Sequence, residues 1–288
     1  MENIRGSVLM VAAMGLFALE DMFIKRAAQA LPVGQVLMLF GLGGMLAFMA
    51  LTALRGERLF HPAFLGRAMI VKAVMEVIGR LGYTLGIALT PLSNASAILQ
   101  ATPLVVVAGA ALIFGERVGP RRWAAIAIGF LGVLIVLRPG LEGFVPAALF
   151  TVMGMLGFAG RDLATRAAPK VLSNMQLGIY GFAMLIPTGA GLLAFTGGAA
   201  LPGLGVAGQI LAATVFGVAA YWGLTAAMRI GEVSVVTPFR YTRLIFALIL
   251  GALAFGERPD AATLIGSAVI IASGVYTLLR GRRAASGG

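Results

Sequence analysis

The chain has 288 residues, of which 60% are hydrophobic and 11% are charged. Soluble domains carry about 25% charged residues, so this composition excludes a soluble protein and indicates a chain that lies mostly in lipid. The formal net charge of +11 does not indicate nucleic-acid binding, because the basic residues lie between apolar runs, and the lack of cysteine excludes disulfide and thiolate chemistry.

Long apolar segments follow one another along the chain, separated by short connections rich in Gly, Pro and Arg. Each is about 20 residues long, which is enough for a helix to cross the hydrocarbon core. None alternates in polarity as the strands of a membrane barrel would. We therefore predict an all-α membrane protein with ten transmembrane helices. The segments are Ser7–Ala28, Val33–Leu54, Gly66–Leu89, Ser93–Phe114, Pro120–Leu137, Val145–Thr165, Asn174–Thr196, Val206–Ala227, Ser234–Phe255 and Ala261–Leu279.

A tripeptide repeat divides the chain into two halves. Gly115-Glu116-Arg117 recurs as Gly256-Glu257-Arg258, and the same shift of 141 positions places Asp21 on Asp162 and Lys25 on Arg166. We predict one five-helix repeat over residues 1–142 and a second over 143–288. Because five is odd, the second half enters the membrane from the opposite face. Inverted repeats around a central cavity are typical of alternating-access carriers.

Lysine and arginine are distributed unevenly between alternate loops. By our count, 13 of them flank the helix ends on the N-terminal side, and 4 lie on the opposite side. The positive-inside rule then places both termini in the cytoplasm.

The segment Gly66–Leu89 is the least apolar. Lys72, Glu76 and Arg80 are four residues apart, so they share one helix face. Glu76 lies about 15 Å into the membrane, where a charge costs about 2.5–3.5 kcal/mol. We expect this face to line a polar cavity that binds substrate. The alternative is an ion-pair ladder that neutralises itself.

Proline interrupts two segments that correspond in the halves, at Pro103 in the first and at Pro238 in the second. Such interruptions free backbone carbonyls and mark binding sites in transporters. Arg240 is the predicted carboxylate ligand, since a guanidinium matches two oxygens; the alternative for Arg240 and Arg243 is snorkelling to the interface. The tyrosines are expected either to contact a substrate or to pack. The polar and aromatic residues assigned to the cavity with these are Tyr83, Ser96, Gln100, Tyr221, Thr237 and Tyr241.

Acidic and basic residues occur together at the ends of the first and sixth segments. The simplest interpretation is that Asp21 pairs with Lys25, with Glu20 beside them, and that Asp162 pairs with Arg166; gating or proton coupling is the alternative. Glu116 and Glu257 are expected to be structural. The preceding glycine would end one helix, and the glutamate would accept N–H groups at the start of the next.

Known enzyme and ATPase motifs are absent. The sequence has one histidine, His61, no nucleophile or metal motif and no Walker A lysine. We therefore expect no enzyme activity, no cofactor and no metal. The expected partners are a small-molecule substrate and the lipid bilayer. Transport coupled to protons and facilitated transport down the substrate gradient both stay open, and Glu76 is the candidate group if protons are involved. An integral-membrane enzyme for lipids and a passive channel are the alternatives from other classes.

The duplicated Gly-Glu-Arg signature, each copy followed by an apolar helix and an arginine, resembles the paired EamA domains of the drug/metabolite transporter superfamily. Within it the chain is similar to bacterial YddG-type amino-acid exporters. The resemblance implies export of aromatic or neutral amino acids across the inner membrane, with other metabolites or drugs as the alternative. One position departs from the repeat, because Leu244 stands where the first half has Pro103.

A zwitterion would place its carboxylate against Arg80 or Arg240. Its ammonium would lie against Glu76, with a hydrophobic wall for the side chain.

Overall fold

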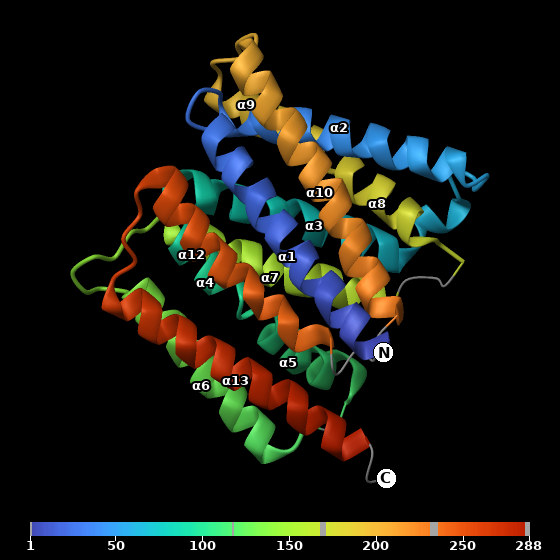
Figure 1. Cartoon of the computed structure of the whole chain (residues 1–288). Helices are drawn as coiled ribbons and strands as arrows, with labels where there is room; N and C mark the ends of the chain where they lie inside the picture. Colours follow the sequence, from blue (N-terminus) through green and yellow to red (C-terminus); the bar gives the residue numbers. More distant parts are fainter. Residues whose placement is uncertain (1, 117, 168–170, 231–235, 286–288) are drawn as a thin grey trace.

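The computed structural model describes residues 2–116, 118–167, 171–230 and 236–285, and all regular structure in them is helical (Figure 1). The first half contains α1 (Glu2–Ala27), α2 (Val33–Leu54), η1 (Pro62–Leu65), α3 (Arg67–Leu89), α4 (Leu92–Leu99), α5 (Thr102–Phe114) and α6 (Pro120–Leu137). The second half contains α7 (Ala148–Arg166), α8 (Asn174–Ala183), α9 (Leu185–Thr196), α10 (Leu204–Ile230), η2 (Thr237–Tyr241), α12 (Thr242–Phe255) and α13 (Ala261–Ala285).

Three predicted segments are interrupted near a proline. The fourth divides into α4 and α5 just before Pro103, and the seventh into α8 and α9 before Pro187. The ninth begins as the 3-10 turn η2, which contains Pro238, and continues as α12. A proline lacks an N–H and clashes with the preceding turn, so each of these positions is a natural break.

Eight spans among the described residues are long and apolar enough to cross a membrane. They comprise α1, α2, α6, α10 and α13 together with the continuous pairs α4–α5, α8–α9 and η2–α12. The helices α3 and α7 are not among the eight. Both carry several charged residues, and most of these belong to the site described below.

The main helix pairs each join one half to the other. The pairs α3–α7, α1–α10 and α6–α13 pack along their lengths, and α2 packs on both α8 and α9 (Figure 1). When the halves are exchanged, α3–α7 maps onto α1–α10, and the other pairs map onto themselves. The N-terminus of α1 and the C-terminus of α13 lie at the same end of the bundle (Figure 1).

Glycines allow α3 and α7 to approach to backbone contact. A Cβ on Gly157 would lie 2.3 Å from the backbone N of Gly79, and one on Gly82 would lie 2.5 Å from the carbonyl O of Phe150. Such contacts supply the van der Waals packing that holds helices together in lipid. The charged residues of α3 are therefore held directly against α7.

Candidate functional site

Eight charged residues from four helices meet in the interior of the bundle. We call them the charged cluster. They come from α1, α3, α7 and α12, and therefore from both halves. The members are Glu20, Asp21, Lys72, Glu76, Arg80, Arg161, Asp162 and Arg243.

Glu76 lies among three cations. Its Oε2 is 3.4 Å from Lys72 Nζ, and its Oε1 is 3.5 Å from Arg161 Nη1 and 3.9 Å from Arg80 Nε. A Cβ on Gly181 of α8 would come within 3.5 Å of Oε2, so the carboxylate packs against that helix. Only 7% of the Glu76 side chain is exposed. Lys72, Glu76 and Arg80 thus form ion pairs along one face of α3, as the ladder alternative describes, and Arg161 of α7 joins them. Binding of substrate at this face stays a prediction.

Arg80 connects Glu76 to α1. Its Nη1 donates to Glu20 Oε1 at 2.8 Å, and its guanidinium lies over the rings of Phe40, Phe158 and Phe182, with 5.5–5.9 Å between the guanidinium carbon and each ring centroid. Glu20 is fully buried, and its Oε2 has no hydrogen-bond partner among the described residues. This carboxylate packs on Gly217 of α10, where a Cβ would come within 3.0 Å of Oε2.

Asp21 accepts hydrogen bonds from two other helices. Tyr83 donates its hydroxyl to Oδ2 at 2.9 Å, and Arg243 donates Nη2 and Nε to the same oxygen at 2.7 and 3.2 Å. The Arg243 guanidinium also lies over the rings of Phe17 and Tyr83. The alternative that Arg243 snorkels to the interface is therefore wrong, since Asp21, a buried acid, supplies a closer partner than the interface.

The prediction of a local pair on α1 is also wrong. Asp21 binds Arg243, and Lys25 donates instead to the Thr90 carbonyl at 2.5 Å and to Glu257 at 3.1 Å. On α7, Asp162 accepts from its neighbour Arg161 at 2.7 Å, while the Arg166 side chain lies outside the described residues. Partners from packed helices reach these groups at hydrogen-bonding distance, and burial makes such contacts stronger than exposed pairs four residues apart.

Glu257 fixes one end of the bundle. It accepts the backbone N–H groups of Leu92 and Ser93 at 2.6 and 3.0 Å and the Ser93 hydroxyl at 2.9 Å, in addition to Lys25. Burial raises the pKa of Glu257, but these hydrogen bonds and Lys25 outweigh it and lower the pKa below its ordinary value. The carboxylate thus caps α4, which belongs to the other half.

Glu257 was expected to accept N–H groups at the start of the helix that follows it, but Asp260 does this instead. Asp260 Oδ1 accepts the N–H of Thr263 at 2.9 Å in the first turn of α13. A hydrogen bond from Arg138 lowers the pKa of Asp260 to about 2. The glycine part of the prediction is confirmed, since Gly115 and Gly256 end their helices at φ +67° and +65°. Glu116 is exposed at the end of α5.

The remaining predicted site residues lie beside the charged cluster. Gln100 of α4 donates to the carbonyl of Arg240 at 3.2 Å. Tyr241 packs over Gly274 of α13, at a glycine with no room for a Cβ. The Arg240 guanidinium is within electrostatic range of Asp162, Arg161 and Arg243. Ser96 and Thr237 are buried on α4 and η2, so these residues line the contact between α4, η2 and α13.

Tyr221 on α10 lies on the other side of the cluster. Its ring meets Phe48 edge-on at 5.2 Å, and it is within electrostatic range of Arg161 and Glu76. The contact with Phe48 agrees with the packing role expected of Tyr221, and contact with a substrate stays a prediction.

Sequence reasoning missed Arg161 and Arg243 as cluster members. The 141-position shift offered a signal for the first, because it places Glu20-Asp21 on Arg161-Asp162. It therefore marks two corresponding polar pairs in the halves. No similar signal distinguished Arg243 from Arg240.

The cluster holds opposite charges in alternating order from α1 to α7. Charges within membrane-spanning helices are costly, and they usually pair with one another where they carry a function. No group of three His, Cys, Asp or Glu able to hold a metal occurs in the parts of the chain that the structure describes.

A bundle of apolar spanning helices around a buried charged cluster defines a multi-pass membrane protein with an intramembrane polar site. Residues 4–138 and 145–279 each match the EamA-like transporter family, and the chain belongs to this family. It is a membrane protein of a drug/metabolite transporter family.

Several relatives carry transporter names. A riboflavin transporter of Rhizobium johnstonii is 31% identical over 73% of this chain and 69% of its own length. An S-adenosylmethionine uptake transporter of Rickettsia bellii is 23% identical over 75% and 74% of the two chains. A pseudopaline exporter of Pseudomonas aeruginosa is 25% identical over 92% and 93%.

A solved crystal structure has a TM-score of 0.61 to this chain at 18% identity. It covers 96% of this chain and 98% of that one, which shows a common fold.

Proposed function

We propose that this protein is a secondary carrier that moves small zwitterionic or anionic metabolites across the bacterial cytoplasmic membrane by alternating access. Export of neutral and aromatic amino acids is the first activity to test. The observation that carries the proposal is the charged cluster, where α1, α3, α7 and α12 of the two halves place paired acids and bases inside the bundle.

The proposed carrier has ten spans in two inverted halves, residues 1–142 and 143–288. Two observations support this. The family matches each half once, and the main helix contacts are preserved when the halves are exchanged. In this arrangement α3 and α7 also cross the membrane, and their charges are shielded from lipid by each other and by α1.

The substrate would enter by replacing existing ion pairs. A carboxylate would compete with Glu20 for Arg80, or bind Arg240, while an ammonium would take the place of Lys72 beside Glu76. A zwitterion adds one charge of each sign, so the net charge of the site stays the same. The displaced Glu20 and Lys72 would then need new partners or water.

A second candidate is a riboflavin-like substrate with a planar ring system. The relative with this name is 31% identical. The buried rings of Phe40, Phe158 and Phe182 already lie around the planar guanidinium of Arg80, and a planar ring system would take the place of that guanidinium between them.

Counterflow in proteoliposomes tests both candidates. Vesicles loaded with unlabelled substrate should accumulate trace labelled amino acid or riboflavin transiently, and Arg80→Gln should abolish this. A carrier shows such trans-stimulation, whereas a channel does not. Absence of counterflow across a broad panel of amino acids, riboflavin and organic anions would contradict the proposal.

A further inference from the structure

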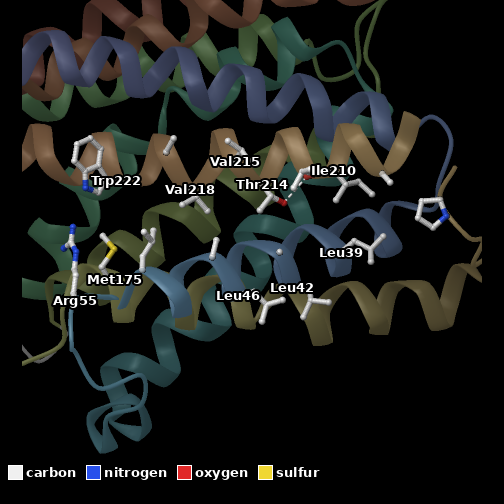
Figure 2. A pocket seen from close by; sticks show the side chains of 17 residues that line it. Leu39, Leu42, Leu46, Arg55, Met175, Ile210, Thr214, Val215, Val218 and Trp222 are labelled. Atoms are coloured by element: carbon white, nitrogen blue, oxygen red, sulfur yellow. Dashed lines mark hydrogen bonds between the residues drawn. The ribbon is translucent and has the colours of Figure 1, made fainter. Parts of the chain in front are cut away.

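A long apolar groove runs between α2 and α10 (Figure 2). Its volume is about 860 Å³. One wall carries Leu42 and Leu46 of α2, and the other carries Val215, Val218 and Trp222 of α10 (Figure 2). Leu46 and Val215 are 53% and 56% exposed, so the groove opens to the surroundings of the bundle.

The groove is separate from the charged cluster. Gly217 of α10 faces Glu20, whereas Thr214, Val218 and Trp222 line the groove at intervals of four residues. Thr214 bonds within its own helix, to the Ile210 carbonyl at 2.9 Å. The wall therefore presents no polar group that requires a ligand along most of its length.

One end of the groove is different, because it combines a cation with an indole. Arg55 and Trp222 lie there with Met175 (Figure 2). Arg55 follows the last residue of α2, about 33 Å from the start of that helix at 1.5 Å per residue. Trp222 lies about 27 Å from the start of α10.

Both helices start at the same end of the bundle. Gln35, near the start of α2, donates to the carbonyl of Ala200 and accepts its N–H, just before α10 begins. Arg55 and Trp222 therefore reach the same level of the membrane. With a hydrocarbon core about 30 Å thick, that level is the headgroup region.

We propose that this groove is a binding site for an anionic phospholipid, whose phosphate lies at Arg55 and whose acyl chain follows the apolar wall toward Leu46. Charge complementarity selects this occupant. Arg55 makes no ion pair with the described residues, and it stands at the end of an otherwise apolar channel. Basic residues between helices at the membrane surface bind acidic headgroups, and aromatic rings favour the same depth.

Quenching of Trp222 by brominated lipids tests this site. The chain has two tryptophans, so Trp123→Phe leaves Trp222 as the reporter. The protein is reconstituted in vesicles that contain increasing fractions of dibromo-phosphatidylglycerol or dibromo-phosphatidylcholine. We expect half-maximal quenching at a fraction of dibromo-phosphatidylglycerol about fivefold lower than that of dibromo-phosphatidylcholine. This is the preference that the attraction of one arginine near the surface for an anionic headgroup provides.

The matched variants are Arg55→Gln and Arg58→Gln in the Trp123→Phe background. Both arginines are exposed at the same end of the bundle, but Arg58 does not line the groove. Arg55→Gln should bring the ratio between the two lipids to about one, and Arg58→Gln should leave it unchanged, with unfolding temperatures showing that both variants fold. Equal quenching by the two lipids, or equal effects of the two variants, would overturn the site. If neither lipid quenches Trp222, the site is also overturned, because a second copy of the chain or another protein would then cover the groove.

Discussion

Glu20 and Arg80 form a buried ion pair whose side chains are 0% and 13% exposed. A buried pair adds little net stability compared with apolar residues, but removal of one partner leaves a charge without compensation. The pair is thus poorly explained as a device for stability. Its position between α1 and α3 fits a contact that must break and re-form.

We predict a strong coupling between the two residues. Arg80→Gln should lower the free energy of unfolding by about 3–5 kcal/mol, because Glu20 loses its counterion. The double variant Glu20→Gln/Arg80→Gln should recover a large part of that loss while transport stays abolished. Thermal unfolding in detergent and counterflow measure the two effects. Additive losses would show that the residues do not act as a pair.

Glu257 gives a prediction for pH. Its pKa is lower in the folded protein than the ordinary value of 4.5, so its stabilisation is complete above that value and is lost as the pH falls through the lowered value. The unfolding temperature should therefore fall more steeply below about pH 4.5 in the natural protein than in Glu257→Gln. Glu142→Gln, at an exposed loop position, serves as the control and should retain the steep fall.

The sequence identified the residues of the site better than their partners. Lys72, Glu76 and Arg80 were found because a spacing of four defines a helix face. The contact of Arg80 with Glu20, sixty residues away, depends on how α1 packs against α3. The same holds for Lys25 and Glu257, which lie in different halves. Local spacing carries no information about such packing.

Helices were predicted well where hydrophobicity decides and less well where proline acts. The predicted Val33–Leu54 and Pro120–Leu137 coincide with α2 and α6. The break between α8 and α9 before Pro187 was missed, although Pro103 and Pro238 were recognised as interruptions. An intramembrane proline distorts a helix, but whether the helix ends or only bends depends on the neighbouring helices.

The α3–α7 contact gives a prediction at the level of helices. Gly157→Ala would place a Cβ 2.3 Å from the backbone N of Gly79, where no side chain can move aside. We expect a loss of about 1–3 kcal/mol in the free energy of unfolding, as for overpacked cores. Gly191→Ala on α9 has open space around it and should be neutral or slightly stabilising. Equal effects of the two substitutions would contradict close packing at this crossing.

Transmembrane topology can be read directly because the natural chain contains no cysteine. Single cysteines at the exposed positions Arg58, Glu142 and Ala199 should divide between the two faces in the proposed ten-span arrangement. An impermeant maleimide added to intact cells should label the cysteines at positions 142 and 199 and leave the one at position 58 unlabelled. The opposite pattern would reverse the orientation. Labelling of positions 58 and 142 from the same side would contradict the crossing assigned to α3, and labelling of positions 142 and 199 from opposite sides would contradict the crossing assigned to α7.

The contacts of Glu257 suggest how the whole molecule changes state. Lys25 on α1, the start of α4 and the turn before α13 meet at this carboxylate and close one end of the bundle. Ser93 lies inside this closure and is 1% exposed. For a carrier to alternate, the closure must open in the other state, since a permanently sealed end would allow no passage.

Cysteine accessibility at position 93 tests this opening. Ser93→Cys should react slowly with an impermeant maleimide, because the side chain is buried. Lys25→Ala in the same background removes one of the groups that hold Glu257, so the open state becomes more populated and labelling should accelerate about tenfold, the effect of a shift near 1.4 kcal/mol. Substrate should change the rate in both backgrounds, because a ligand that favours one state shifts the populations.

Arg58→Ala, remote from the closure, should leave the rate unchanged. If Lys25→Ala does not change the labelling rate, and if saturating substrate does not change it either, this end does not open during transport.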